Sequence, residues 1–227
     1  MNSSEKRSKK ERIIIYRGII CVAGWVALFL ICLGKMLEDT YNGDAFVTFG
    51  NLFSTYTIQS NLLVAIWLTI ALVYRNKDDK PLILESKIHG AITLYITVTF
   101  LVFALFLASS HNPTGLFILT NLLVHYVIPI AFIIEWILTE TNVKYKWSFL
   151  LYWITYPLFY IIYTIIRGYI TGFYPYSFID LNQISFVQMI ITTILLASLF
   201  LLLGSLYIFL NRRIYNVKMS GKDEKKY

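Results

Sequence analysis

Residues 114–139 read TGLFILTNLLVHYVIPIAFIIEWILT, an apolar run long enough to cross a bilayer as a helix. Four residues stand out in this run: Asn121, His125, Pro129 and Glu135. On a helix, Asn121 and His125 lie one turn apart and Glu135 falls about three turns beyond His125, so all three share one broad face. Because Pro129 has no N–H for the His125 carbonyl, we expect the helix to bend beside the histidine. Ionisable groups at membrane depth are costly, which makes this stretch the first candidate for a functional site.

The composition of the whole chain is that of a membrane protein. Of its 227 residues, 57% are hydrophobic and 15% charged, whereas soluble domains carry about 25% charged residues. The apolar residues gather in six runs, at about 13–34, 46–74, 88–109, 114–139, 147–168 and 186–210. We therefore predict an all-α membrane protein with six transmembrane helices in one bundle. This domain spans residues 13–211, between a basic N-terminal segment, 1–12, and a basic tail, 212–227.

The charges indicate how the chain is oriented. Its net charge of +7 lies in short flanks between the apolar runs, a pattern that argues against nucleic acid as a partner. Eighteen of the twenty lysines and arginines fall on one side of the predicted membrane, and Lys35 and Arg167 are the two exceptions. By the positive-inside rule, both termini are expected in the cytoplasm. Two cysteines and three histidines predict neither a disulfide framework nor a metal site, and we expect no cofactor.

The second apolar run carries the densest polar segment, residues 54–61. Its residues Ser54, Thr57 and Asn61 are spaced three and four apart and share one helix face. At ~1.5 Å per residue, Thr57 and His125 each lie roughly 16 Å below the outer boundary of a ~30 Å core. A hydroxyl becomes a nucleophile when a base removes its proton, and histidine is the commonest such base. Matched depth thus makes Thr57 and His125 a candidate catalytic pair.

Other interpretations of these residues remain open. Threonine in a membrane helix commonly bonds a carbonyl of its own preceding turn or a neighbouring helix, and His125 could be a packing histidine bonded to a neighbouring helix. Spacing ranks Thr57 first, although Thr55, on another face, and Ser60, which is partly aligned, are not excluded. Asn61 or Asn121 could orient the histidine or donate to an oxyanion.

A further polar stripe is predicted on the fifth helix. Its members recur at intervals of four, three and four residues: Tyr156, Tyr160, Tyr163 and Arg167. Such a stripe could bind the carboxylate of an acidic lipid, with Arg167 as the cation; alternatively, Arg167 snorkels above an aromatic packing seam. We expect Glu135 to form a structural ion pair, and His89 and His111 to lie at the membrane interface without a role.

Three segments resemble one known family. Residues 53–63, FSTYTIQSNLL, resemble the threonine-bearing segment of the androgen-induced-gene and androgen-dependent TFPI-regulating protein family. Asn121 and His125, followed by Pro129 and Glu135, resemble the family's histidine-bearing helix. Residues 172–175, GFYP, with Phe178 and Asp180 after them, are similar to its aromatic loop after the fifth helix.

The resemblance implies an intramembrane threonine hydrolase, in which Thr57 is the nucleophile and His125 the base. Animal members cleave fatty acid esters of hydroxy fatty acids, so membrane lipids or a lipid ester are the expected partners. Bacterial members are small six-helix proteins, which implies a place in a bacterial cytoplasmic membrane. Two alternatives are a non-catalytic carrier of an acidic amphiphile and a membrane scaffold that binds another protein.

Overall fold

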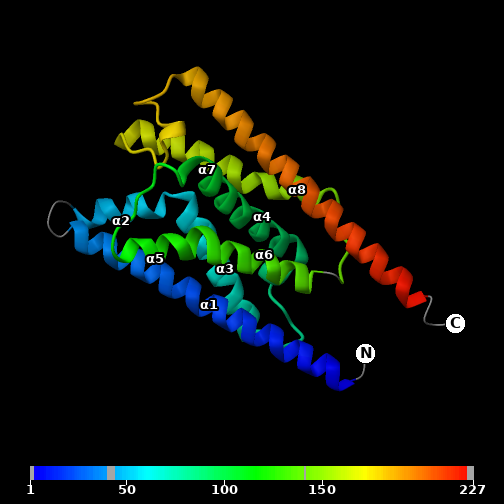
Figure 1. The fold of residues 1–227 in the computed structure, drawn as a ribbon. Coiled ribbons are helices and arrows are strands. Elements are labelled where there is room, and N and C mark those ends of the chain that lie inside the picture. The colour runs from blue at the N-terminus through cyan, green and yellow to red at the C-terminus, as the bar shows by residue number, and fades with distance from the viewer. Residues whose placement is uncertain (1–2, 40–43, 141, 224–227) are drawn as a thin grey trace.

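The computed structural model describes residues 3–39, 44–140 and 142–223, and all regular elements within these ranges are helical. Figure 1 shows one elongated bundle whose N- and C-terminal ends lie at the same end. Six of its helical segments are long and apolar enough to cross a membrane, as predicted. The protein is thus consistent with an integral multipass membrane protein. The predictions for residues 1–2, 40–43 and 224–227 lie outside the described residues.

The first and last helices are longer than the apolar runs that predicted them. Helix α1 spans Ser3–Asp39 and α8 spans Phe186–Asp223, so much of the basic N-terminal segment and of the basic tail continues the helix. Helix α7, Phe149–Thr171, matches its predicted run closely. Two single 3-10 turns, η1 at Leu82–Leu84 and η4 at Ser177–Ile179, lie in the connections.

The second apolar run does not form the single helix expected over 46–74. It divides into α2, Ala45–Phe53, and α3, Tyr56–Val73. The break lies at Ser54 and Thr55, whose hydroxyls donate to the carbonyls of Gly50 and Leu52. Serine and threonine hydroxyls form hydrogen bonds to nearby backbone groups that would otherwise be paired within a helix. Here such bonds accompany the end of α2 and the start of α3.

The third and fourth runs each contain a π-helical turn. Helix α4, Ser86–Val102, continues into η2, Phe103–Leu107. The fourth run consists of α5, Leu116–Leu122, the π turn η3, Leu123–Val127, and α6, Ile128–Thr139. Pro129 lies two residues after the end of η3, in the first turn of α6, so the perturbation expected beside His125 takes the form of a widened turn around it.

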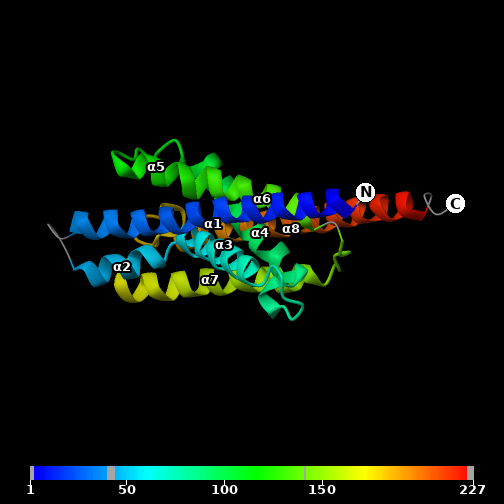
Figure 2. The ribbon, with the colours of Figure 1, turned by 90° about the horizontal axis from the view of Figure 1, so that it is seen from below.

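The core is divided between two apolar clusters on either side of α4. One joins α4 to α1, α3 and α6, and includes Leu28, Leu68 and Phe132. The other joins α4 to α7 and α8, and includes Tyr95 and Trp153. Figure 2 shows the helices running along a common long axis, with the connections gathered at the two ends. Helix α4 is the most enclosed of the six spans and holds the two halves together.

Candidate active site

Thr57 lies in the first turn of α3, immediately after the break in the second span. The residue before that helix, Thr55, is its N-cap: its backbone is extended, and its Oγ1 accepts from the Ile58 N–H at 3.4 Å. Thr55 Oγ1 also donates to the Leu52 carbonyl, so this hydroxyl both accepts and donates hydrogen bonds at the helix start. Thr57, in contrast, points across to the fourth span, and of these two threonines it is the one that meets His125.

His125 lies within the π turn η3 and contacts polar partners through both ring nitrogens. Its Nε2 is 3.4 Å from Thr57 Oγ1, and its Nδ1 is 2.8 Å from Asn121 Oδ1. With Asn121 Oδ1 as acceptor, the proton resides on Nδ1 and the lone pair of Nε2 faces the threonine hydroxyl. This is the tautomer that a general base needs, and a long contact in a ligand-free site is common. Phe103 stacks on the imidazole at 3.6 Å between ring centroids and limits its rotation.

Asn61 connects the two halves of the site. Its Nδ2 donates to the Thr57 carbonyl at 2.9 Å and to the Val124 carbonyl at 3.1 Å. In the register of the π turn, the donor to Val124 would be the N–H of residue 129, which proline lacks. Asn61 therefore replaces a backbone donor, and both of its amide protons are engaged. Of the two roles expected for it, this geometry favours positioning over oxyanion binding.

An apolar cavity of about 200 Å³ opens beside Thr57, between α4, α7 and α8. Its walls include Val98, Leu158 and Phe200, and Thr57 and Tyr176 are among the hydroxyl-bearing residues that line it. The backbone N–H of Thr57 donates to Tyr176 Oη at 3.3 Å. Burial raises the pKa of the Tyr176 phenol above its ordinary value, so the group stays protonated as a hydrogen-bond donor. Tyr176 was not predicted as a site residue; it lies in the aromatic loop after the fifth span.

The tyrosine stripe of α7 contacts the break between α2 and α3. Tyr160 donates to the Ser54 carbonyl at 3.0 Å, Tyr163 Oη lies 3.2 Å from Ser54 Oγ, and Arg167 Nη2 donates to Asn51 at 2.7 Å. Tyr160 also lines the cavity, whereas Tyr163 and Arg167 do not. These three residues, predicted as a carboxylate-binding groove, are thus engaged in holding the broken helix, and Tyr160 alone of them borders the cavity.

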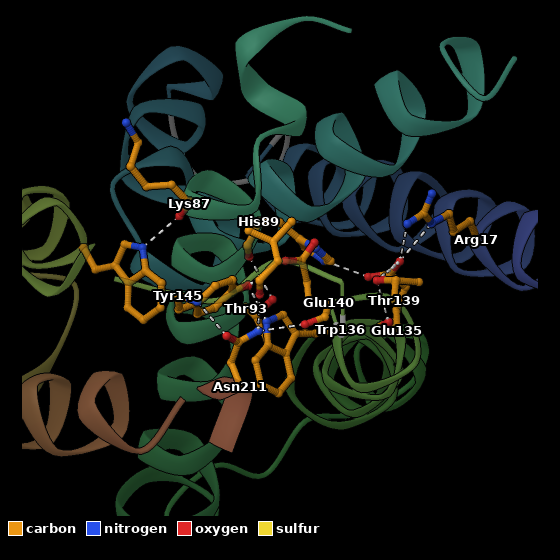
Figure 3. A network of polar contacts seen from close by, with 12 residues as sticks. Arg17, Lys87, His89, Thr93, Glu135, Trp136, Thr139, Glu140, Tyr145 and Asn211 are labelled. Atoms are coloured by element: carbon orange, nitrogen blue, oxygen red, sulfur yellow. Dashed lines mark hydrogen bonds and ion pairs between the residues drawn. The ribbon is translucent and has the colours of Figure 1, made fainter. Parts of the chain in front are cut away.

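Glu135 belongs to a separate buried network (Figure 3). Its Oε1 accepts from Arg17 Nη2 at 2.6 Å, and its Oε2 is 2.7 Å from His89 Nε2. The ion pair expected for Glu135 is present. His89, for which no role was expected, is a buried member of this network, because its side chain is 1% exposed and its Nδ1 lies 3.0 Å from Glu140 Oε1. The imidazole thus lies between two carboxylates, with Glu135 at Nε2 and Glu140 at Nδ1.

Glu140 lies just beyond α6 and closes this network. Burial by itself would raise the pKa of Glu140, but hydrogen bonds from His89, Ser86 and Tyr145 outweigh it and hold the pKa below its ordinary value. The network was not predicted from the sequence, because Arg17 was counted among the eighteen lysines and arginines on the cytoplasmic side of the membrane. An arginine four residues inside an apolar run was the signal that could have found it.

No family model, curated protein or solved structure matches this chain. Within the described ranges, no group of three or more histidine, cysteine, aspartate or glutamate side chains is placed to hold a metal ion. The candidate site consists of Thr57, His125 and Asn121 and the groups around them.

Proposed function

We propose that the protein is an intramembrane hydrolase of lipid esters, with Thr57 as nucleophile and His125 as general base. The observation that carries the proposal is the chain of contacts from Thr57 Oγ1 to His125 Nε2 and from His125 Nδ1 to Asn121 Oδ1. A hydroxyl, a correctly oriented imidazole and a group that orients it are the elements of nucleophilic acyl transfer. The order of the three motifs that resemble the androgen-induced-gene family supports the same assignment.

The reaction follows from the positions of these groups. His125 Nε2 takes the proton of Thr57 Oγ1, which attacks the ester carbonyl carbon and forms a tetrahedral intermediate. As the intermediate collapses, the protonated His125 gives its proton to the departing alkoxide, leaving an alcohol and an acyl-threonine. Water, deprotonated by His125, then attacks the acyl group, and Thr57 regains its proton as the fatty acid leaves. Asn121 holds the imidazole through both steps.

The break between α2 and α3 would stabilise the negative charge that develops on the ester oxygen in the tetrahedral intermediate. Thr57 lies at the N-terminus of α3, where the helix dipole stabilises anions. Nine residues of α2 precede the break, which at ~1.5 Å per residue places it roughly 13 Å along a ~30 Å span. Broken helices with their N-termini near the bilayer midplane are common in sites that bind anionic groups. The Tyr176 phenol, at the same end of the cavity, is the side chain placed to donate to the oxyanion.

The cavity supports an acyl-chain substrate. Its walls are apolar apart from a few hydroxyls, and its volume of about 200 Å³ lies below the ~300–1,000 Å³ of drug-sized ligand sites. It therefore suits a segment of a hydrocarbon chain with the ester at the Thr57 end. We further infer that both termini face the cytoplasm, from the distribution of lysine and arginine, and that the membrane is a bacterial cytoplasmic one, from the family resemblance.

The test uses the purified protein in detergent, a fluorophosphonate probe and a long-chain fatty acid ester. We expect a covalent adduct on Thr57, located by mass spectrometry, and expect Thr57→Ala and His125→Ala to lower turnover by about 10³-fold. Thr55→Val is the matched control: loss of the cap lowers stability by ~1 kcal/mol and leaves turnover of the folded fraction unchanged. Wild-type turnover in Thr57→Ala would overturn the mechanism.

The same experiment bears on a second candidate function, a carrier of an acidic amphiphile. This candidate is favoured by Arg167, whose Nη1 is buried and has no hydrogen-bond partner within the described part of the chain. A carboxylate could satisfy that group. A folded wild type that is neither labelled nor able to hydrolyse esters, but that binds a fatty acid saturably, would favour the carrier.

A further inference from the structure

A second, polar cavity of about 570 Å³ lies at the end of the bundle that carries both chain termini. It is bordered by α1, the end of α3, the end of α6 and α8, which come from distant parts of the sequence. We call it the basic vestibule, because six of its lining residues are cationic: Lys9, Lys10, Arg17, Arg75, Lys80 and Lys218. It is separate from the cavity at Thr57, since the two share no lining residue.

The positive charge of the basic vestibule is not balanced by the acids that line it. Glu140 is the one carboxylate among its described lining residues, and it is already held by His89 and Tyr145. Asp78 and Asp79 lie in the same loop as Lys80 but do not line the cavity. Arg17 is paired with Glu135 and Lys218 donates to Asn142, which leaves Lys9, Lys10, Arg75 and Lys80 as the surplus cations of the lining. A concave surface with such a surplus concentrates anions.

Trp67 provides an independent observation. This residue lines the basic vestibule, is 3% exposed, and its Nε1–H has no hydrogen-bond partner within the described ranges. His89 stacks on its ring at 4.0 Å, and the Arg17 guanidinium lies 5.1 Å from the ring centroid. A buried donor without an acceptor is unfavourable. The vestibule thus combines surplus cations with a donor that lacks an acceptor.

The positive-inside distribution does not explain this convergence. Lys77, Lys144 and Lys146 lie in the loops at the same end of the bundle, yet none of them lines the cavity. Lys77 lies over the Tyr74 ring and Lys144 faces the Tyr215 ring. The residues that do line it approach from both terminal helices and from the loop after α3, so tertiary packing gathers them around one space.

We propose that the basic vestibule binds an anion that carries a phosphate group. A phosphate monoester bears about −1.5 to −2 charges at neutral pH and three acceptor oxygens, which several cations can satisfy together better than a single carboxylate. A volume of about 570 Å³ is within the range of small-molecule sites and leaves room for the group that the phosphate is attached to. The phosphate can belong to a lipid headgroup of the adjacent leaflet or to a soluble molecule.

The experiment measures binding to the full chain in detergent by native mass spectrometry and by thermal stabilisation. The probes are dioctanoyl phosphatidic acid, inorganic pyrophosphate and, as a zwitterionic control, dioctanoyl phosphatidylcholine. The vestibule variant combines Lys10→Gln, Arg75→Gln and Lys80→Gln. The matched control combines Lys77→Gln, Lys144→Gln and Lys146→Gln, which removes the same charge from the same end of the molecule.

We expect saturable binding of a phosphate probe that weakens on the order of tenfold or more in the vestibule variant and less than about twofold in the control. Binding of phosphatidic acid without competition by pyrophosphate identifies a lipid headgroup, and competition by pyrophosphate identifies a soluble ligand. Absence of saturable binding to folded wild type, or equal weakening by both triple variants, would overturn the proposal. Thr57→Ala is expected to bind as wild type does, so this test is independent of the hydrolase.

Discussion

Asn121 shows how a single residue sets the chemistry of its neighbour. Its Oδ1 lies 2.8 Å from His125 Nδ1, and this contact directs the lone pair of Nε2 toward Thr57. If the acceptor is lost, the proton is free to move to Nε2, where it blocks the base. A histidine in the wrong tautomer keeps its position but not its function.

We therefore predict that Asn121→Leu lowers kcat for ester hydrolysis by about 10²- to 10⁴-fold. Asn121→Asp, which retains an acceptor at the same place, is expected to keep most of the activity. The measurement is steady-state turnover together with the rate of fluorophosphonate labelling at Thr57. Labelling of Asn121→Leu at the wild-type rate would show that the amide does not orient the base.

At the scale of elements, two irregularities in two helices belong together. The break between α2 and α3 places Thr57 at a helix N-terminus, and the π turn η3 places His125 opposite it. Asn61 joins them, because it donates both to the Thr57 carbonyl and to the Val124 carbonyl that Pro129 leaves without a donor. Neither irregularity would position the pair without the other.

This coupling predicts a non-additive pair of substitutions. Asn61→Ala should lower the unfolding free energy by ~1 kcal/mol, because it removes the hydrogen bond to Thr57 within α3 and the hydrogen bond to Val124 on the fourth span. Pro129→Ala restores a backbone N–H for Val124, so Asn61→Ala should cost less in that background, with a coupling energy of roughly 0.5 kcal/mol or more. Chemical unfolding in detergent measures both values.

Pro81→Ala, at the start of η1 on a different part of the bundle, is the control for this cycle. Combined with Asn61→Ala, it should give additive changes in unfolding free energy. Additivity in the Pro129 cycle as well would show that Asn61 does not replace the missing proline donor.

At the scale of the whole molecule, the network of Arg17, His89, Glu135 and Glu140 ties the first, third and fourth spans together. Asn211 of α8 extends it, since it donates to the Glu140 carbonyl and accepts from the Tyr145 N–H. Glu135 is fully buried, and a buried charge that loses its partner is strongly destabilising.

We predict that Arg17→Met lowers the unfolding free energy by about 3–5 kcal/mol, because it leaves the buried Glu135 carboxylate without its arginine partner. Adding Glu135→Gln should restore part of the loss. Arg7→Met, which breaks an exposed pair with Glu11, is the control and should change stability by less than ~1 kcal/mol. Equal effects of the two arginine substitutions, measured by chemical unfolding, would contradict a structural role for the network.

The sequence by itself determined the six spans, since their length and apolar composition follow from the thickness of the bilayer. It also determined the pairing of Asn121 with His125, because residues four apart on a helix are neighbours. The equal depth of Thr57 and His125 followed from counting residues from the membrane boundary, and the structure brings the two side chains within 3.4 Å.

Only the tertiary structure decided how these parts meet. A serine and threonine run is compatible with a continuous helix or with a break, and contacts from α7, about a hundred residues away, accompany the break. The burial of His89, the approach of Tyr176 to Thr57 and the gathering of cations in the basic vestibule likewise join residues far apart in the chain. Local periodicity cannot encode such contacts, because they depend on which helix faces pack together and on how far along the bundle axis each helix is displaced.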